Sequence, residues 1–228
     1  MFAKKSRFAQ QPSLLLGAQE DIDALAAKEH ALLLVISDSH GNAAIVRTIL
    51  EYFGGKADAL CFCGDGIEDI LAALETACAD NDLARCIPPV IALVRGNGDA
   101  GIYHLYDKIS VPKDVQFTAA GRRVFMTHGH NYDVYYSPNM LYATAAETQS
   151  SLLLFGHTHV ANVQQKDGVT LLNPGSCSRP RGGQPQTLAL VTVGTSIDYS
   201  YYKLPSASDN EGFFQPFMPS TAGFSFLW

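Results

Sequence analysis

Side chains that could bind a metal ion or transfer a proton recur at the ends of apolar segments in this sequence. They lie in the motifs "DSHG", "GDG", "GNGD", "THGH", "GHTH" and "NPGS", and they are Asp38, His40, Asp65, Asn97, Asp99, His128, His130, His157, His159 and Asn173. Imidazole and carboxylate groups ligate divalent metals and also serve as acids and bases in enzymes. The residue types therefore suggest metal or acid–base chemistry, provided that the fold brings these segments together.

Taken singly, each motif has a simpler interpretation. Asp38 could cap the following helix, whereas "GNGD" is typical of a turn and "NPGS" of a loop. Glycine flanks nearly every one of these motifs, however, and each motif follows an apolar segment. Because ligands of open α/β sheets bind beyond the carboxyl ends of the strands, the joint pattern favours one shared site. His30 and His104 fall outside the pattern and are interpreted as ordinary surface or core residues.

The segments between the motifs predict the elements that must position them. Strands buried on both faces are expected at 31–36, 57–63, 89–94, 122–128 and 150–156. Helices are expected at 42–53, 68–79 and 138–149. The later chain predicts a hairpin at 162–173 and a strand pair at 186–204. A βα first half and a β-rich second half indicate an α/β fold, a four-layer α/β/β/α sandwich of two stacked mixed β-sheets.

The chain divides into three parts on composition and pattern. Residues 1–30 hold one short expected helix and form an accessory extension, and 31–204 form the main domain. Residues 205–228 form an aromatic-rich tail that contains the only tryptophan. Because a bare aromatic surface would aggregate, this tail is expected to dock on its own domain or on a partner subunit, so a homo-oligomer is one expected arrangement.

Composition narrows the classes of partner. The 228 residues carry a net charge of −6 and no basic tract beyond a short N-terminal group, which argues against binding to long nucleic acid or to an anionic membrane. The apolar runs are too short to span a bilayer. Five cysteines, an odd number, fit reduced thiols in the cytoplasm. Cys61 and Cys63 are interpreted as small core residues rather than metal ligands.

The six motifs, in this order, resemble those of the calcineurin-like metallophosphoesterase superfamily, and within it the small YfcE-like phosphodiesterases of bacteria and archaea. The resemblance extends from about Leu32 to about Tyr202. It implies a hydrolase with two divalent metal ions. One ion would take Asp38, His40 and His159, the other would take Asn97, His128 and His157, and Asp65 would bridge both. Such mixed nitrogen and oxygen ligation suits Mn, the leading expectation, or Fe, Ni, Co or Zn rather than a dedicated calcium site.

The implied reaction is hydrolysis of a small phosphodiester by a metal-activated hydroxide, with Asp65 and Asn97 in the catalytic centre. No protein nucleophile is required, and Ser37 and Ser39 are interpreted as turn or supporting residues. A phosphomonoesterase remains the alternative, because the same two-metal core serves both reactions. A scaffold protein without catalytic activity, like the retromer subunit that shares this fold, ranks lower because every ligand position keeps a residue that can bind metal.

One position departs from the family pattern. Gly98 occupies a position that is histidine in many relatives, where it is thought to protonate the leaving group, and often cysteine in the YfcE-like group. A positioned general acid contributes roughly 10²–10⁴-fold. His130 is the nearest substitute and is also a candidate for binding substrate together with Asn97, although a role in holding the loop is an equal interpretation. Asp99 is interpreted as a supporting carboxylate.

Two arginines follow the last motif, in "CSRPRGG". Arg181 is expected to grip a substrate phosphate through its planar fork of donors, and relatives carry a similar Pro-Arg here. For Arg179, the interpretation as a solvated loop residue is favoured by a narrow margin over contact with the substrate phosphate. Tyr132 matches a family tyrosine, with a place in the pocket or in the core as equal alternatives.

Overall fold

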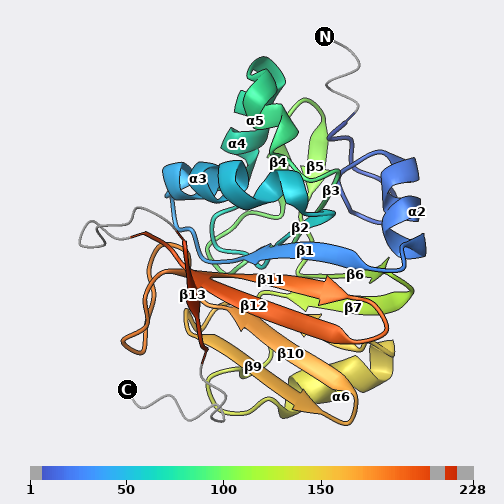
Figure 1. Cartoon of the computed structure of the whole chain (residues 1–228), viewed down its shortest axis with the longest axis vertical. Coiled ribbons are helices and arrows are strands. Elements are labelled where there is room, and N and C mark those ends of the chain that lie inside the picture. The colour runs from blue at the N-terminus through green and yellow to red at the C-terminus, as the bar shows by residue number, and fades with distance from the viewer. Residues whose placement is uncertain (1–6, 206–213, 220–228) are drawn as a thin grey trace.

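Two mixed β-sheets lie face to face at the centre of the structure, a computed structural model that describes residues 7–205 and 214–219 (Figure 1). The strands of the first sheet are, in spatial order, β13 (Gln215–Phe217), β12 (Ile197–Lys203), β11 (Thr187–Val193), β1 (Ala31–Ile36), β2 (Ala59–Phe62) and β3 (Val90–Leu93). Those of the second are β6 (Asp114–Ala119), β7 (Arg122–Thr127), β8 (Leu152–Leu154), β10 (Val169–Pro174) and β9 (Ala161–Lys166). In each sheet three neighbouring strands run parallel, β1-β2-β3 and β7-β8-β10.

Helices cover the outer faces of the two sheets, except α2 (Gln19–Ala27), which packs at their edge against β3 and β6 and adds Ile22 and Leu25 to the core between them. The helices are α2 (Gln19–Ala27), α3 (Ala43–Phe53), the short 3₁₀ helix η1 (Gly54–Lys56), α4 (Ile67–Ala79), α5 (Asn81–Arg85) and α6 (Asn139–Thr148). Figure 1 shows α3, α4 and α5 on one side of the stacked strands and α6 on the other. A small hairpin of β4 (Ile102–His104) and β5 (Lys108–Ser110) lies beside β3. This arrangement confirms the predicted α/β/β/α sandwich.

Alternation along the strands explains the layers. In β1, Leu33 and Val35 point into the core between the sheets, whereas Leu34 and Ile36 pack under α3 and α4. Successive side chains of a strand point to opposite faces, so a strand buried on both faces must be apolar throughout. Cys61 and Cys63 of the β2 segment both face the core between the sheets and are fully buried. Their assignment as core residues agrees with these positions, and all five cysteines are unpaired.

The chain outside the two sheets also packs on the core. Leu15 and Leu25 of the N-terminal extension are buried, and the backbone of Leu16 exchanges two hydrogen bonds with Ile91 of β3. At the other end, β13 adds an edge strand to β12, and Phe214 packs edge-on against Phe53. The described part of the tail therefore docks on its own domain; the other aromatic residues of the tail lie outside the described residues. The division at residues 30 and 204 stays a prediction.

Every predicted helix and strand is present, with boundaries shifted by one or two residues at most ends. The elements η1, α5, β4, β5, β6 and β13 were not predicted. Among the described residues, no helix has the length and apolar character needed to cross a membrane. The order of the strands places the carboxyl ends of β1, β2, β3, β7, β8 and β10 next to the candidate motifs. This edge is where the site must be sought.

Candidate metal centre

The backbone turns sharply where the candidate ligands leave their strands. Five of the seven have a positive φ, between 47° and 67°, and they are Asp38, His40, Asp65, His157 and His159. This left-handed region is uncommon for residues other than glycine, although Asp and His adopt it more readily than most. Each such residue costs on the order of 1–3 kcal/mol and persists only where surrounding contacts impose it. Strain of this kind clusters at functional sites.

Hydrogen bonds between the motifs hold these turns. The Asp38 N–H donates to the carbonyl of Gly64 at 2.9 Å, and the His40 N–H donates to the carbonyl of Asp65 at 3.0 Å. The His157 N–H donates to Oδ2 of Asp38 at 3.2 Å. The loops after β1, β2 and β8 are therefore fastened to one another, so their side chains are held in a fixed relation.

Asp38, His40 and His159 form the first cluster. Nε2 of His159 lies 3.2 Å from Oδ1 of Asp38 and 3.0 Å from Nε2 of His40. Their ligand atoms are close enough to contact one ion. Oδ1 of Asp38 is buried and has no hydrogen-bond partner. A buried carboxylate oxygen without a hydrogen bond is costly unless it meets a positive charge, so this atom fits a cation.

Asp65 and His128 form the second cluster together with Asp38, and the His157 ring lies beside His128. Nε2 of His128 lies 3.6 Å from Oδ2 of Asp65 and 3.2 Å from Nδ1 of His157. Asp65 also approaches the first cluster, with its Oδ2 3.8 Å from Nε2 of His40. This carboxylate thus lies between the two groups of imidazoles. Asn97 lies in an exposed turn and lines the same cleft as His40 and Asp65, so it borders the cluster rather than packing inside it.

Backbone carbonyls orient two of the imidazoles. Nδ1 of His128 lies 2.7 Å from the carbonyl of Cys63, and Nδ1 of His159 lies 2.6 Å from the carbonyl of Arg179. A proton on Nδ1 satisfies each contact, and the Nε2 lone pair then faces the cluster. Metal-binding histidines commonly use such a partner to fix the ring and its tautomer.

Two carboxylates outside the clusters hold the loops. Asp99 accepts hydrogen bonds from the N–H groups of Asp65, Gly66, Ile67 and Gly96 at 2.6–3.1 Å. This confirms the interpretation of Asp99 as a supporting carboxylate. Asp69, which sequence reasoning missed, accepts from the Ser39 hydroxyl at 2.5 Å and from the Gly41 N–H at 2.9 Å.

Both serines beside Asp38 also have supporting contacts. Ser37 donates to Oδ2 of Asp38 at 2.6 Å, and Ser39 is held by Asp69. Among the described residues, neither hydroxyl is hydrogen-bonded to a histidine. Glycine is required nearby, because a Cβ at Gly156 would lie 2.1 Å from the Ser37 hydroxyl.

The pKa values of Asp65, His157 and His40 are lowered, whereas burial lowers the pKa of His128 but its hydrogen bond to Asp65 and the charges of Asp38 and Asp65 outweigh this and raise it. Burial raises the pKa of Asp65, but the hydrogen bond and charge of His128 and the Gly98 N–H outweigh it, so the pKa falls well below its usual range. Burial lowers the pKa of His157 to about 4, and the neighbouring charge of His128 adds to this effect. Burial likewise lowers the pKa of His40, against the opposing charge of Asp38. Ionised carboxylates and neutral imidazoles are the forms that bind metal.

The remaining candidates surround the clusters. The ring of His130 lies 5.4 Å from that of His128, and its buried Nδ1 has no hydrogen-bond partner. Burial, reinforced by the charge of His128, lowers the pKa of His130. Arg179 donates from Nη2 to the carbonyl of His40 at 3.3 Å, so it is an exposed loop residue that also touches the site. Tyr132 packs edge-on against Phe125 in the core under α6, which favours the core interpretation.

Tyr135 is a site residue that sequence reasoning missed. Its hydroxyl donates to the carbonyl of His157 at 3.0 Å and accepts from Nη1 of Arg181 at 2.8 Å. Its ring packs edge-on against the His157 ring, with centroids 5.0 Å apart. A tyrosine in a loop carries no local signal of this role, because its partners lie 22 and 46 residues away.

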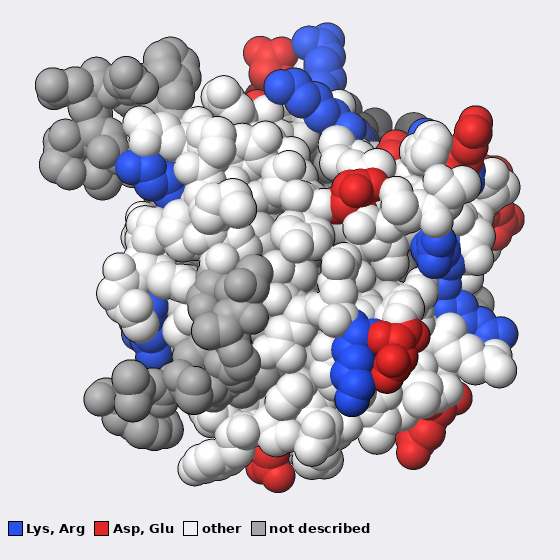
Figure 2. Space-filling model, turned by 60° about the horizontal axis from the view of Figure 1, so that its bottom comes forward, with Lys and Arg blue, Asp and Glu red and all other residues white. Residues whose placement is uncertain are grey.

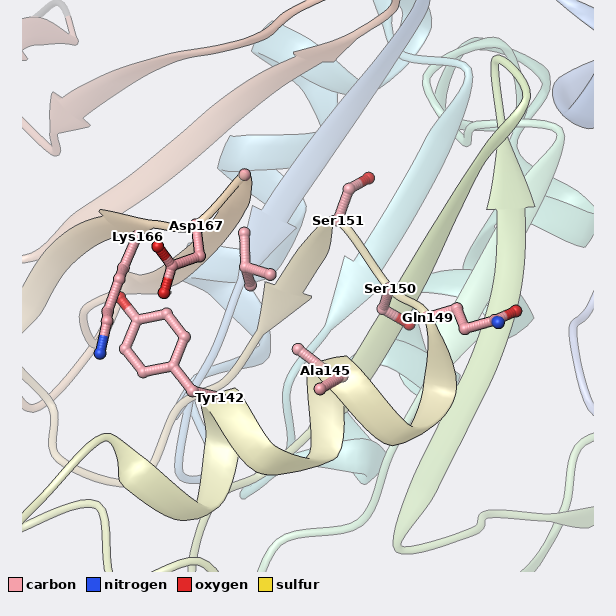
Figure 3. Close-up of a pocket in the computed structure, with 10 residues that line it drawn as sticks. Tyr142, Ala145, Gln149, Ser150, Ser151, Lys166 and Asp167 are labelled. Atoms are coloured by element: carbon pink, nitrogen blue, oxygen red, sulfur yellow. The ribbon is translucent and has the colours of Figure 1, made fainter.

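A cleft of about 450 Å³ opens beside the clusters, and its lining includes His40, Asp65 and Asn97. A groove of similar size lies between α6 and the β9–β10 turn, and its lining includes Tyr142, Lys166 and Asp167 (Figure 3). None of the candidate ligands lines that groove. Chemistry rather than size therefore distinguishes the cleft.

The chain belongs to the calcineurin-like phosphoesterase superfamily, whose domain model matches residues 32–196. The phosphodiesterase YfcE of Escherichia coli K12 is 31% identical over 170 residues, which cover 70% of this chain and 86% of the relative. These matches confirm the resemblance inferred from the motifs and support hydrolase activity. The family uses divalent metals, and the donor set described above fits such an ion.

Solved structures agree on the fold. A predicted phosphoesterase from Streptococcus pneumoniae TIGR4 matches with a TM-score of 0.60 and 26% identity, over 84% of this chain and 99% of that protein. Vacuolar protein sorting 29 from Cryptosporidium parvum matches with a TM-score of 0.63 and 18% identity, over 83% of this chain and 96% of that protein. At this lower identity, the second likeness shows the fold alone.

Proposed function

We propose that this protein is a binuclear metal-dependent phosphodiesterase that acts on small substrates. One ion would be held by Asp38, His40 and His159, and the other by Asn97, His128 and His157, with Asp65 shared. Mn is the leading candidate, with Fe, Ni, Co or Zn as alternatives, because the donors mix imidazole nitrogen with oxygen. When bound, such a pair of ions supplies an activated water and positive charge that offsets charge developing on phosphorus oxygens.

The protein's own residues would orient and hold the reacting groups. Asp65 would keep its position because Gly98 donates to its Oδ1 at 2.9 Å and Asp99 accepts from its N–H at 2.6 Å. His128 and His159 would present Nε2 to the centre, because their Nδ1 atoms face backbone carbonyls. These side chains would therefore need to move little during the reaction, and such preorganisation is what electrostatic catalysis requires.

Three residues are proposed to contact the substrate. Asn97 lines the cleft and could donate its amide to a phosphoryl oxygen. Arg181 would use the donors that do not bind Tyr135 to grip the same group. His130 is proposed to supply the proton that Gly98 cannot, since its ring lies 5.4 Å from that of His128 and its buried Nδ1 has no hydrogen-bond partner.

The observation that carries the proposal is the buried Oδ1 of Asp38, which has no hydrogen-bond partner and faces His159 at 3.2 Å. The test is metal analysis of the purified protein, followed by assay of bis(p-nitrophenyl) phosphate with each divalent ion. We expect about two ions per chain and hydrolysis that EDTA abolishes. A chain without bound metal that hydrolyses nothing with any ion would refute the proposal.

A phosphomonoesterase is the first alternative, since Arg181 could hold a dianionic phosphate. Turnover of p-nitrophenyl phosphate faster than that of the diester, with Mn present, would favour it. The second alternative is a scaffold without catalysis, favoured by the likeness to vacuolar protein sorting 29. Absence of hydrolysis together with intact folding would favour the scaffold.

We also propose a cytoplasmic location and a substrate smaller than nucleic acid. The five unpaired cysteines suit a reducing compartment. On the face seen in Figure 2, lysine and arginine are scattered among acidic residues rather than gathered into a tract. Binding to long nucleic acid needs several clustered phosphate contacts, and membrane binding needs a basic or apolar face. A homo-oligomer remains a prediction, which light scattering would test.

A further inference from the structure

Two kinds of residue line the cleft beside the metal centre. His40, Asp65 and Asn97 are candidate ligands, whereas Glu68 and Tyr103 are not. Glu68 lies in the first turn of α4, and Tyr103 lies on β4 of the small hairpin. A phosphate ester held by the candidate ligands would share the cleft with Glu68 and Tyr103.

The charged side chains that line the cleft are all acidic, and the guanidinium of Arg95 lies against Gly101 outside this lining. Asp69 and Asp99 also line the cleft, but both are occupied by hydrogen bonds that hold the loops. Glu68 is exposed, and no side chain among the described residues pairs with its carboxylate. The described residues that line the cleft include neither lysine nor arginine. A substituent with its own negative charge would therefore meet repulsion here.

Tyr103 adds an aromatic surface to the cleft. Its hydroxyl accepts from the Ala100 N–H at 2.8 Å, which fixes the ring against the loop after β3. Burial raises the pKa of Tyr103, and the negative charges of Asp99 and Glu68 add to the rise, against the hydrogen bond from the Ala100 N–H. An aromatic face beside a carboxylate is a common recognition site for ammonium groups.

The basic groups lie on a different flank of the centre. Arg179 contacts the carbonyl of His40, and Arg181 contacts the hydroxyl of Tyr135. Neither arginine lines the cleft. A bound diester would thus find cationic donors on the flank that faces its phosphoryl oxygens and a carboxylate on the flank that faces one substituent.

We infer that Glu68 and Tyr103 make this cleft a selectivity pocket for phosphodiesters whose alcohol substituent carries an ammonium group. This inference rests on the proposed phosphodiesterase function and adds the substrate class. A neutral alcohol would be accepted less well, and an anionic one least.

The test compares three chromogenic diesters with the same leaving group. They are the p-nitrophenyl phosphate esters of ethanol, of 2-(trimethylammonio)ethanol and of 3-hydroxypropionate. The measured quantity is kcat/KM of the cationic ester divided by that of the anionic ester, with Mn-loaded full-length protein at low salt. General changes in activity cancel in this ratio.

We expect Glu68→Gln to lower the ratio about 5- to 10-fold, because the loss of this exposed charge weakens the attraction to the cationic ester and removes the repulsion of the anionic ester. Glu68→Lys should lower the ratio further. Salt at 0.5 M should shrink the difference. Tyr103→Leu should lower turnover of the cationic ester about 2- to 5-fold relative to the ethyl ester. Glu20→Gln, the same change in the first turn of α2, is the matched control and should leave the ratio unaltered.

Two results would overturn the inference, and they are distinguishable. If all three esters are hydrolysed but the ratio does not respond to Glu68, or follows Arg181→Gln instead, the cleft does not select charge while the proposed function stands. If none is hydrolysed with any divalent ion, the proposed function fails and the selectivity fails with it.

Discussion

The Asp99 carboxylate offers the sharpest test of how the fold positions the centre. It holds the loop after β2 by accepting two N–H groups on each oxygen: Gly66 and Ile67 on Oδ1, and Asp65 and Gly96 on Oδ2. Asp99→Asn keeps the shape of the side chain but replaces one acceptor oxygen with an amide that only donates. Two of the four N–H groups then lose their acceptor and face another donor.

The expected loss follows from these bonds. A hydrogen bond to a charged group contributes about 1.5–3 kcal/mol, and Asp99 is partly exposed, so the lower end applies to both lost bonds. We therefore expect the free energy of unfolding to fall by about 3 kcal/mol. Because Asp65 is held in a left-handed conformation by this carboxylate, affinity for Mn should also fall, by roughly 10- to 100-fold.

Urea denaturation in EDTA measures the first quantity, and calorimetric titration with Mn measures the second. Asp82→Asn is the control, since its side chain is 92% exposed and its loss should change neither. Ordinary surface substitutions change the free energy of unfolding by less than about 1 kcal/mol. If Asp99→Asn changes the free energy of unfolding by no more than this and the variant binds Mn normally, the loop does not depend on this carboxylate.

Further predictions address the ligands, their support and the core. His157→Ala and Asp65→Asn should each lower diesterase activity at least about 100-fold with unchanged circular dichroism, Asp65→Asn more severely; near-normal turnover would refute the ligand assignment. Tyr135→Phe should lower kcat/KM about 10-fold and weaken Mn binding, whereas a purely structural role would move only the melting temperature. Burial raises the pKa of Tyr201, so its stabilising effect is present below about pH 10 and is lost as pH rises. Tyr201→Phe should lower the free energy of unfolding at pH 8 by about 1 kcal/mol, because the hydroxyl donates to two buried carbonyls. In urea denaturation, the free energy of unfolding of this variant should fall less between pH 8 and pH 11 than that of the wild type. An equal fall in both proteins would contradict this prediction.

Local patterns were sufficient for most of the fold. The apolar run at 31–36 could only be a strand buried on both faces, and the turn at Asp167 and Gly168 appears with the positive φ that its residues permit. The short strand β6, in contrast, shows only a brief alternation of buried and exposed residues. The edge strand β13 depends on pairing with β12, which no local pattern contains.

The candidate site divides in the same way. Residue types and glycine-flanked strand ends were enough to select the candidate ligands, because imidazoles and carboxylates that follow buried strands have few other uses in such number. The supporting residues were not accessible in this way. Asp69, Tyr135 and Glu68 are ordinary polar residues in sequence, and their roles depend on what lies opposite them.

The sequence by itself determined which groups could bind metal and that parallel strands would end beside them. Tertiary structure alone decided that the His157 N–H donates to Asp38 from 119 residues away, that Asp99 accepts from four N–H groups, and that Glu68 lines the same cleft as the candidate ligands. The physical reason is range: hydrophobic periodicity is a local property of the chain, whereas a hydrogen bond or an electrostatic field is set by whichever distant residue the fold brings near.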